Sequence, residues 1–184
     1  MIWFTADTHF GHKNILEYSA RPFSTIEEMN EALIKNWNSK VANDDDVFHL
    51  GDVGLCSPSK LKEILNQLNG KIYLIRGNHE KSAEACKERF EWIKDYYELS
   101  IDDQEGYQGK QLVVLMHYAM RVWPASHFGT YHLYGHSHGE LPDDTSSLSL
   151  DVGVDCHNYA PVSYEDVNRI MKTKKWIRPH LRGE

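Results

Sequence analysis

The chain has 184 residues, with 20 lysines and arginines against 27 aspartates and glutamates, and its formal charge is −7. Hydrophobic residues make up 41% and charged residues 26%, which is typical of a folded globular protein and excludes a disordered, collagen-like or coiled-coil chain. No apolar run approaches the roughly 20 residues that cross a bilayer. The net negative charge disfavours a protein that grips duplex nucleic acid.

The length favours one domain over residues 1–184, and the sequence shows no internal repeat, linker or low-complexity stretch. The first residues, MIWFTAD, lack the basic start and apolar centre of a secretory signal. The three cysteines lie far apart and form no Cys-x-x-Cys pair, as is typical of reduced thiols. We therefore expect a cytoplasmic protein that does not enter a membrane.

Residues 2–6 form a short β-rich run that predicts the first strand, and the polar segment after it predicts a loop. Ser24 and Thr25 then precede two glutamates, a pattern that marks the start of a helix. Apolar residues recur after this start at intervals of three and four, which is the spacing of an amphipathic helix.

Residues 47–50 predict a second strand, and residues 71–76 predict a third. Between them, Ser57 and Pro58 mark the start of another helix, which Gly70 closes. Strands that alternate with helices in this way favour right-handed crossovers and a largely parallel sheet.

The second half of the chain is richer in strands, which we predict over residues 96–101, 111–116, 131–134 and 148–154. A last helix is expected after Ser163. The two halves together predict an α/β fold in which two sheets pack face to face with helices outside.

Side chains that can bind metal ions follow the predicted strands, at the point where each strand ends. Because loops at the carboxyl ends of parallel strands converge on one crevice, we expect these side chains to meet. Seven residues are the candidate ligands: Asp7, His9, Asp52, Asn78, His117, His136 and His138.

Carboxylates, imidazoles and one carboxamide form a nitrogen and oxygen donor set without thiolate. Such a set suits two divalent ions, for which manganese is our first choice and iron, nickel, zinc or magnesium are alternatives. A carboxylate bridges two ions readily, and the central position of Asp52 in the motif order makes it the expected bridge. Two neighbouring ions can activate a shared hydroxide for attack on a phosphate ester.

Three further residues are candidates for contact with a substrate. We expect His79 to lie outside the metal shell and to act as the catalytic donor to the phosphoryl group or as the acid for the leaving oxygen. His12, three residues after His9, and Arg21, in the following loop, are candidates for binding the substrate.

The order of these residues resembles the five motif blocks of the calcineurin-like metallophosphoesterase superfamily. The blocks here are Asp7-Thr8-His9, Gly51-Asp52, Gly77-Asn78-His79-Glu80, His117 and Gly135-His136-Ser137-His138. The segment DVGVDCHNYAPVS, residues 151–163, is similar to the small bacterial and phage-borne branch of that superfamily.

The resemblance implies a β-sandwich flanked by helices and a dinuclear metal centre. It implies that Asp7, His9, Asp52 and His138 hold one ion. It also implies that Asp52, Asn78, His117 and His136 hold the other and that His79 is catalytic.

We therefore expect a metal-dependent phosphoesterase that acts on a small phosphate ester or a nucleotide. Between the motif blocks no insertion is large enough for a cap domain, which favours a phosphodiesterase over a monophosphatase. A nuclease or a cyclic-nucleotide phosphodiesterase would use the same chemistry. A non-catalytic scaffold of the same fold is a further alternative, which the complete set of candidate ligands opposes.

Overall fold

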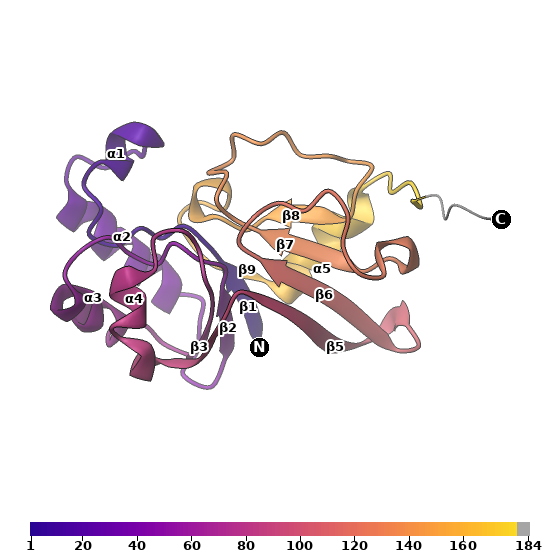
Figure 1. Cartoon of the computed structure of the whole chain (residues 1–184), viewed down its shortest axis with the longest axis horizontal. Coiled ribbons are helices and arrows are strands. Elements are labelled where there is room, and N and C mark those ends of the chain that lie inside the picture. The colour runs from indigo at the N-terminus through magenta and orange to yellow at the C-terminus, as the bar shows by residue number, and fades with distance from the viewer. Residues whose placement is uncertain (180–184) are drawn as a thin grey trace.

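The computed structural model describes residues 1–179, in which nine strands form two sheets (Figure 1). The first sheet has the strand order β4-β3-β2-β1-β9. Its members are β1 (Ile2–Thr5), β2 (Asp46–His49), β3 (Lys71–Ile75), β4 (Phe90–Lys94) and β9 (Val162–Ser163). Strands β1 to β4 are parallel and β9 is antiparallel to β1, so the carboxyl ends of β1 to β3 share one edge.

The second sheet has the order β5-β6-β7-β8. Its members are β5 (Tyr96–Tyr107), β6 (Lys110–Met116), β7 (Tyr131–Tyr134) and β8 (Ser149–Asp151). Strands β5 and β6 form a hairpin, whereas β6, β7 and β8 are parallel to one another. The carboxyl ends of β6 and β7 therefore form a second edge from which polar loops emerge.

The α-helices are α1 (Ile15–Tyr18), α2 (Ile26–Asn38), α3 (Pro58–Leu65), α4 (Lys81–Glu84) and α5 (Tyr164–Thr173). Figure 1 shows α2, α3 and α4 on the side of the first sheet and α5 next to the strands of the second sheet. Three short 3-10 turns are η1 (Lys87–Arg89), η2 (Ser126–Phe128) and η3 (Val154–Cys156). None of the helices in residues 1–179 combines the length and the apolar character that crossing a membrane requires.

Side-chain caps fix the starts of the three longer helices where the sequence predicts them. The hydroxyl of Thr25 accepts the N–H of Glu28 at the start of α2, and Ser57 accepts that of Lys60 at the start of α3. Ser163 accepts the N–H of Asp166 at the start of α5. These bonds satisfy N–H groups that have no partner within the first turn, so the local sequence determines each helix start.

The first sheet is buried on both faces, which explains why its strands are short and apolar. One face packs against α2 and α3, where Trp3 and Val47 meet Leu33 and Leu61 in one core cluster. The other face packs against the second sheet, and this cluster also takes in residues of α5. Its members include Phe4, Phe48, Leu50, Ile75, Leu115, Leu133 and Val167. The predicted α/β fold of two packed sheets with flanking helices is confirmed.

Several elements differ from the sequence-based expectation. Strand β4 was not predicted, because residues 90–94 (FEWIK) lie at the edge of the sheet and mix apolar and charged side chains without a regular alternation. Strand β8 is shorter than predicted, since residues 154–156 leave the sheet as η3. Strand β5 extends past Ile101 into the hairpin, with a register shift in its pairing to β6.

Candidate metal centre

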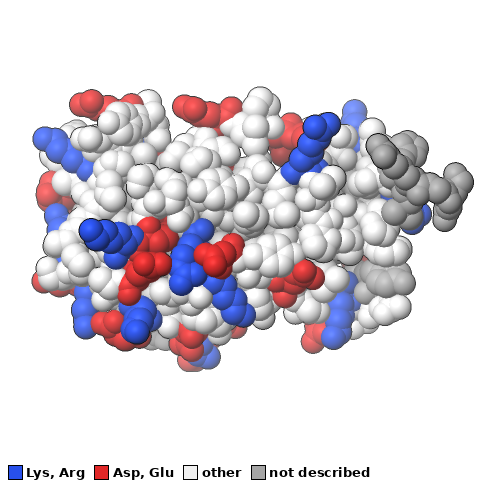
Figure 2. Space-filling model, in the orientation of Figure 1, with Lys and Arg blue, Asp and Glu red and all other residues white. Residues whose placement is uncertain are grey.

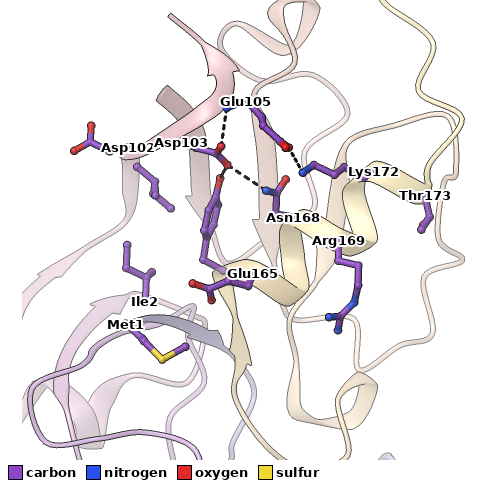
Figure 3. Close-up of a pocket in the computed structure, with 12 residues that line it drawn as sticks. Met1, Ile2, Asp102, Asp103, Glu105, Glu165, Asn168, Arg169, Lys172 and Thr173 are labelled. Carbon is purple, nitrogen blue, oxygen red and sulfur yellow. Dashed lines mark hydrogen bonds and ion pairs between the residues drawn. The ribbon is translucent and has the colours of Figure 1, made fainter. Parts of the chain in front are cut away.

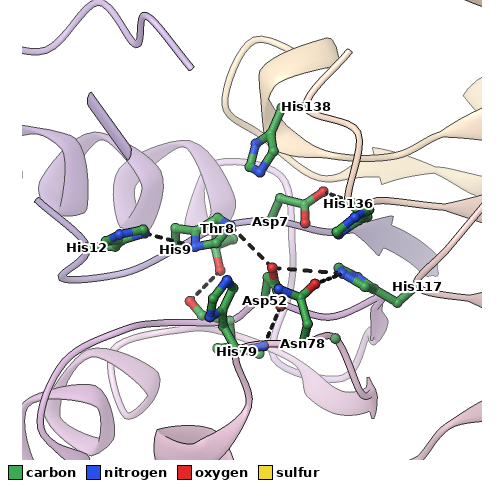
Figure 4. A network of polar contacts seen from close by, with 12 residues as sticks. Asp7, Thr8, His9, His12, Asp52, Asn78, His79, His117, His136 and His138 are labelled. Atoms are coloured by element: carbon green, nitrogen blue, oxygen red, sulfur yellow. Dashed lines mark hydrogen bonds and ion pairs between the residues drawn. The ribbon is translucent and has the colours of Figure 1, made fainter. Parts of the chain in front are cut away.

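The seven predicted ligands gather where the carboxyl ends of the strands from both sheets meet (Figure 4). Two groups of three have ligand atoms that all lie within 4.8 Å of one another: Asp7, His9 and His138 in one, and Asp52, His117 and His136 in the other. Each group combines residues from both sheets, so the centre lies across the open end of the sandwich.

Five of the seven predicted ligands adopt a backbone conformation that non-glycine residues rarely take. The φ angles are 56° at Asp7, 49° at His9, 57° at Asp52, 67° at His136 and 48° at His138. Such left-handed geometry costs free energy and tends to occur at functional sites, and aspartate and histidine tolerate it better than most residues. The turns it creates aim the side chains into one centre as the chain leaves each strand.

Gly51 is required by this packing. Its φ is 99°, and a Cβ atom added there would lie 2.5 Å from Nδ1 of His117. That nitrogen donates to the carbonyl oxygen of Leu50 over 2.7 Å, which leaves Nε2 to face the metal centre. The small residue before Asp52 thus lets the imidazole of the opposite sheet reach the site.

The first group contains buried polar atoms without protein partners. Oδ1 of Asp7 and Nε2 of His9 are buried and have no hydrogen-bond partner within residues 1–179. Burial, together with the nearby carboxylates of Asp151 and Asp52, raises the pKa of Asp7 well above its ordinary value. Burial and the neighbouring His138 lower the pKa of His9 to about 2, so its imidazole is neutral. The neutral imidazole of His9 is already in the state that a divalent cation needs, whereas the raised pKa of Asp7 favours a proton that a cation would displace on binding.

The second group surrounds Asp52. Its Oδ2 lies 3.8 Å from Nε2 of His117, and the same oxygen lies 3.5 Å from Nε2 of His9 in the first group. Oδ1 of Asn78 lies 3.1 Å from Nε2 of His117, so the carboxamide faces the second group. Asp52 is therefore the carboxylate situated between the two groups, where a bridging ligand would lie. The donors present fit two divalent cations.

Arg21 is buried behind the candidate metal centre and binds residues that surround it. This corrects the expectation that Arg21 binds the substrate. Its side chain is fully buried and forms two 2.8 Å hydrogen bonds with the carboxylate of Asp155. The guanidinium also donates to the backbone carbonyls of Asp7 and Thr8. Every face of the group is thus engaged within the protein, and it is not available to a phosphate in the cleft.

Asp155, which the sequence does not mark as a candidate, contacts one of the predicted ligands. Its Oδ2 lies 2.8 Å from Nδ1 of His138. Burial would raise the pKa of Asp155, but the hydrogen bonds from His138 and Arg21 outweigh it and lower the pKa. The ionised carboxylate therefore holds the Nδ1–H tautomer of His138 and turns Nε2 toward the centre. The segment 151–163 was the available signal, since it resembles a known branch although no role was assigned to its residues.

Glu80 holds together the two loops that carry the predicted ligands Asp52 and Asn78. Its carboxylate accepts the backbone N–H groups of Asp52 and Gly77. Burial raises the pKa of this side chain to about 7. The last residue of the Gly77–Glu80 block thereby fixes the loop after β3 against the loop after β2.

His79 and His12 lie beside the metal centre on an open cleft of about 720 Å³. The backbone N–H of His79 donates to Oδ1 of Asp52 over 2.9 Å, while its ring lies 5.9 Å from that of His9. Nδ1 of His12 lies 3.3 Å from Nδ1 of His9, so His12 adjoins a candidate ligand as well as the cleft. Both side chains are positioned to reach a molecule that binds over the centre.

A larger hollow of about 880 Å³ lies between α5 and the β5–β6 hairpin (Figure 3). Its polar groups bind one another. Asp103 accepts from the hydroxyl of Tyr164 and the amide of Asn168, and Glu105 pairs with Lys172. This hollow contains no histidine among its lining residues, so the chemistry that could act on a phosphate lies in the cleft over the metal centre.

Comparison with known proteins agrees with this geometry. The calcineurin-like phosphoesterase family matches the chain over residues 1–179. The chain is 34% identical to the uncharacterized protein MJ1445 of Methanocaldococcus jannaschii, over 96% of this chain and 94% of that protein. It is also 37% identical to the Gene 66 protein of Mycobacterium phage L5, over 52% of this chain and 47% of that protein.

The fold is similar to that of AQ665, a protein of unknown function from Aquifex aeolicus. The TM-score is 0.66 at 22% sequence identity, and the match covers 92% of this chain and 98% of that one. The family match extends over all the described residues and includes the five motif blocks, which confirms the resemblance drawn from their order. The chain belongs to the calcineurin-like phosphoesterase family and is a metal-dependent phosphoesterase.

Proposed function

We propose that this phosphoesterase hydrolyses phosphodiesters, with two divalent ions held in the centre described above. Asp7, His9 and His138 would hold one ion, and Asn78, His117 and His136 would hold the other. Asp52 would contribute to both, because its Oδ2 lies between the two groups. The observation that carries the proposal is the pair of converging donor groups, in which Asp7 and His9 keep buried atoms without partners in residues 1–179.

The chemistry that such ions supply when bound is neutralisation of phosphoryl charge and acidification of an attacking water. The nitrogen and oxygen donor set suits manganese, which is our first choice among the divalent metals. The arginine–aspartate–histidine contacts of Arg21, Asp155 and His138 keep one donor imidazole in the required tautomer.

His79 would protonate the leaving oxygen. Its side chain is exposed at the cleft, and its backbone is fixed to Asp52 by a 2.9 Å hydrogen bond. The imidazole is therefore close to the centre without being one of the converging donors. Proton transfer from a positioned imidazole contributes roughly 10²- to 10⁴-fold to a rate. His12, beside His79 and His9, would contact the substrate from the same side.

The open cleft supports diesters as substrates, because a diester carries a substituent on both sides of the phosphorus. The lining residues surround the metal donors without closing over them, so both substituents have room. The face of the molecule drawn in Figure 2 carries acidic and basic side chains intermixed and shows no continuous basic stripe. Together with the charge of −7, this supports a small ester or nucleotide as the substrate rather than a nucleic-acid duplex.

Chelation and metal replacement test the proposal. We expect a chelator to abolish hydrolysis of an aryl phosphodiester and added manganese to restore it. The same treatment should lower and then restore the thermal stability, because an ion that binds only the folded chain stabilises it. Hydrolysis that is indifferent to the chelator would contradict a metal-dependent mechanism. A reloaded protein that cleaves monoesters far better than diesters would contradict the assignment as a phosphodiesterase.

A further inference from the structure

The cleft over the metal centre has an apolar rim. Three large hydrophobic residues that line it are substantially exposed: Tyr18 at 68%, Leu55 at 41% and Leu141 at 46%. They come from three separate loops or helix ends, so their convergence on one concave site is a property of the tertiary structure. Exposed apolar side chains that gather around a concave polar site are typical of ligand contacts.

Aromatic rings connect the metal centre to this rim. The ring centroid of His12 lies 5.2 Å from that of His9 and 6.4 Å from that of His79. The ring of Tyr18 lies 6.2 Å from that of His12 in an edge-on arrangement. Because Tyr18 meets its neighbour edge-on and is 68% exposed, much of its ring surface is open to a planar group.

The charges that line the cleft limit the kind of phosphate it can take. Besides the phenol of Tyr18, the ionisable groups among its lining residues are the imidazoles of five histidines and the carboxylates of Asp52 and Glu140, without a lysine or an arginine. Arg21, which the sequence predicts as a phosphate contact, is buried against Asp155 and does not line the cleft. Beyond the bound ions and the imidazole of His79, a monoester dianion or a polyphosphate would find no lysine or arginine lining the cleft for its additional charge, and the carboxylate of Glu140 would oppose that charge. A diester carries a single negative charge.

We propose that the cleft selects phosphodiesters whose second substituent, the one that is not the leaving group, bears an aromatic group, which packs against Tyr18 between the apolar side chains of Leu55 and Leu141. This specificity rests on the phosphodiesterase activity proposed above and names the class of substrate that the same site takes. The aromatic group is an aryl ring or a nucleobase, both of which present a flat apolar face.

Three esters with one leaving group test this specificity on the manganese-loaded full chain. They are p-nitrophenyl phosphate, methyl p-nitrophenyl phosphate and bis(p-nitrophenyl) phosphate. A fourth ester, the p-nitrophenyl ester of thymidine 5′-phosphate, distinguishes a nucleobase from a simple aryl ring. We compare KM values, because the second substituent also changes the intrinsic reactivity of the ester. The bis-aryl diester should have a KM about tenfold below that of the methyl diester, and the monoester the highest KM.

Tyr18→Ala and Tyr18→Phe form the matched pair of variants. Tyr18→Ala should raise KM for the bis-aryl diester about three- to tenfold and leave kcat within about twofold, because the ring binds the substrate without taking part in the chemistry. Tyr18→Phe keeps the ring and should behave like the unaltered protein. Metal content should be the same in all three proteins, since the ring of Tyr18 contacts His12 and not the predicted metal ligands themselves.

The outcomes separate the two proposals. Equal KM values for the methyl and bis-aryl diesters, unchanged by Tyr18→Ala, would overturn the aromatic specificity and leave the phosphodiesterase activity standing. A higher kcat/KM for the monoester than for the diesters would overturn both. If the nucleotide ester shares the low KM of the bis-aryl ester and loses it in Tyr18→Ala, the site takes nucleobases. If only the bis-aryl ester has the low KM and loses it in Tyr18→Ala, the site takes simple aryl groups.

Discussion

Oδ2 of Asp155 lies 2.8 Å from Nδ1 of His138, while the other side of the same carboxylate is held by the guanidinium of Arg21. These three residues form a chain of charge-assisted hydrogen bonds that begins in the loop after α1 and ends at a candidate metal ligand. Arg21 also binds the backbone of the Asp7 loop, so one guanidinium fixes two parts of the metal centre. The precision of the centre therefore depends on a residue that does not touch the cleft.

Asp155→Asn should weaken metal binding. The substitution removes the charge that holds the Nδ1–H tautomer of His138, and loss of such a partner costs about 10- to 100-fold in metal affinity. Titration calorimetry with manganese measures the effect. Glu140→Gln, which removes a carboxylate at the exposed rim of the same cleft, is the control and should keep the affinity. An unchanged affinity in Asp155→Asn would show that His138 does not depend on this contact.

Asp52→Asn should lower the occupancy of both ions. Its Oδ2 is the atom that lies near a histidine of each donor group, and a neutral amide oxygen bridges cations poorly. Elemental analysis of the purified protein measures the metal content per chain. Asp44→Asn is the control: it removes an exposed carboxylate just before β2, the strand that Asp52 follows, and should leave the metal content unchanged. Full occupancy in Asp52→Asn would refute its assignment as the bridging ligand.

His79→Ala should keep the metal ions and lose most of the turnover. The bond between His79 and Asp52 uses the backbone N–H, so removing the imidazole leaves that support in place. Loss of a proton donor lowers kcat by roughly 10²- to 10⁴-fold. Steady-state kinetics and metal analysis on the same sample separate the two effects, with His127→Ala as the control outside the cleft. A variant with nearly unaltered kcat would remove His79 from the mechanism.

The metal-free protein should lose stability in mild acid, partly through His132. This residue is fully buried, and burial lowers its pKa from 6.5 to about 4. Above pH 6.5 the imidazole is neutral in both the folded and the unfolded chain. As the pH falls below 6.5 the unfolded chain takes up a proton first, so stability is lost progressively down to about pH 4. The loss from this group amounts to roughly 3 kcal/mol.

Urea unfolding at several pH values in this window tests the assignment. His132 accepts the N–H of Met120 at Nε2 and contacts the carbonyl of Val114 at Nδ1, so His132→Gln should be less stable near neutral pH. Its free energy of unfolding should nevertheless fall less steeply with acid than that of the unaltered protein. Parallel pH profiles for the two proteins would contradict the role assigned to His132.

Local chemistry made much of the fold and the donor set predictable. Thr25, Ser57 and Ser163 each accept an N–H two or three residues into a helix, so nearby residues alone determine those starts. The candidate ligands were recognisable because aspartate and histidine follow strand after strand. Strand β4 escaped prediction, since its residues show no regular pattern of their own and the strand is held by its pairing with β3.

The amino-acid sequence by itself determined the alternation of strands and helices, the chemical nature of the donors and the family to which the chain belongs. Only the tertiary structure decided that Arg21 is buried beside the candidate metal centre and that Tyr18, Leu55 and Leu141 border one cleft. Periodicity and capping arise from interactions within a few residues. Arg21 and Asp155, in contrast, are 134 positions apart. Their contact exists because the packing of the two sheets brings distant parts of the chain together. A pattern within a few residues does not predict that packing.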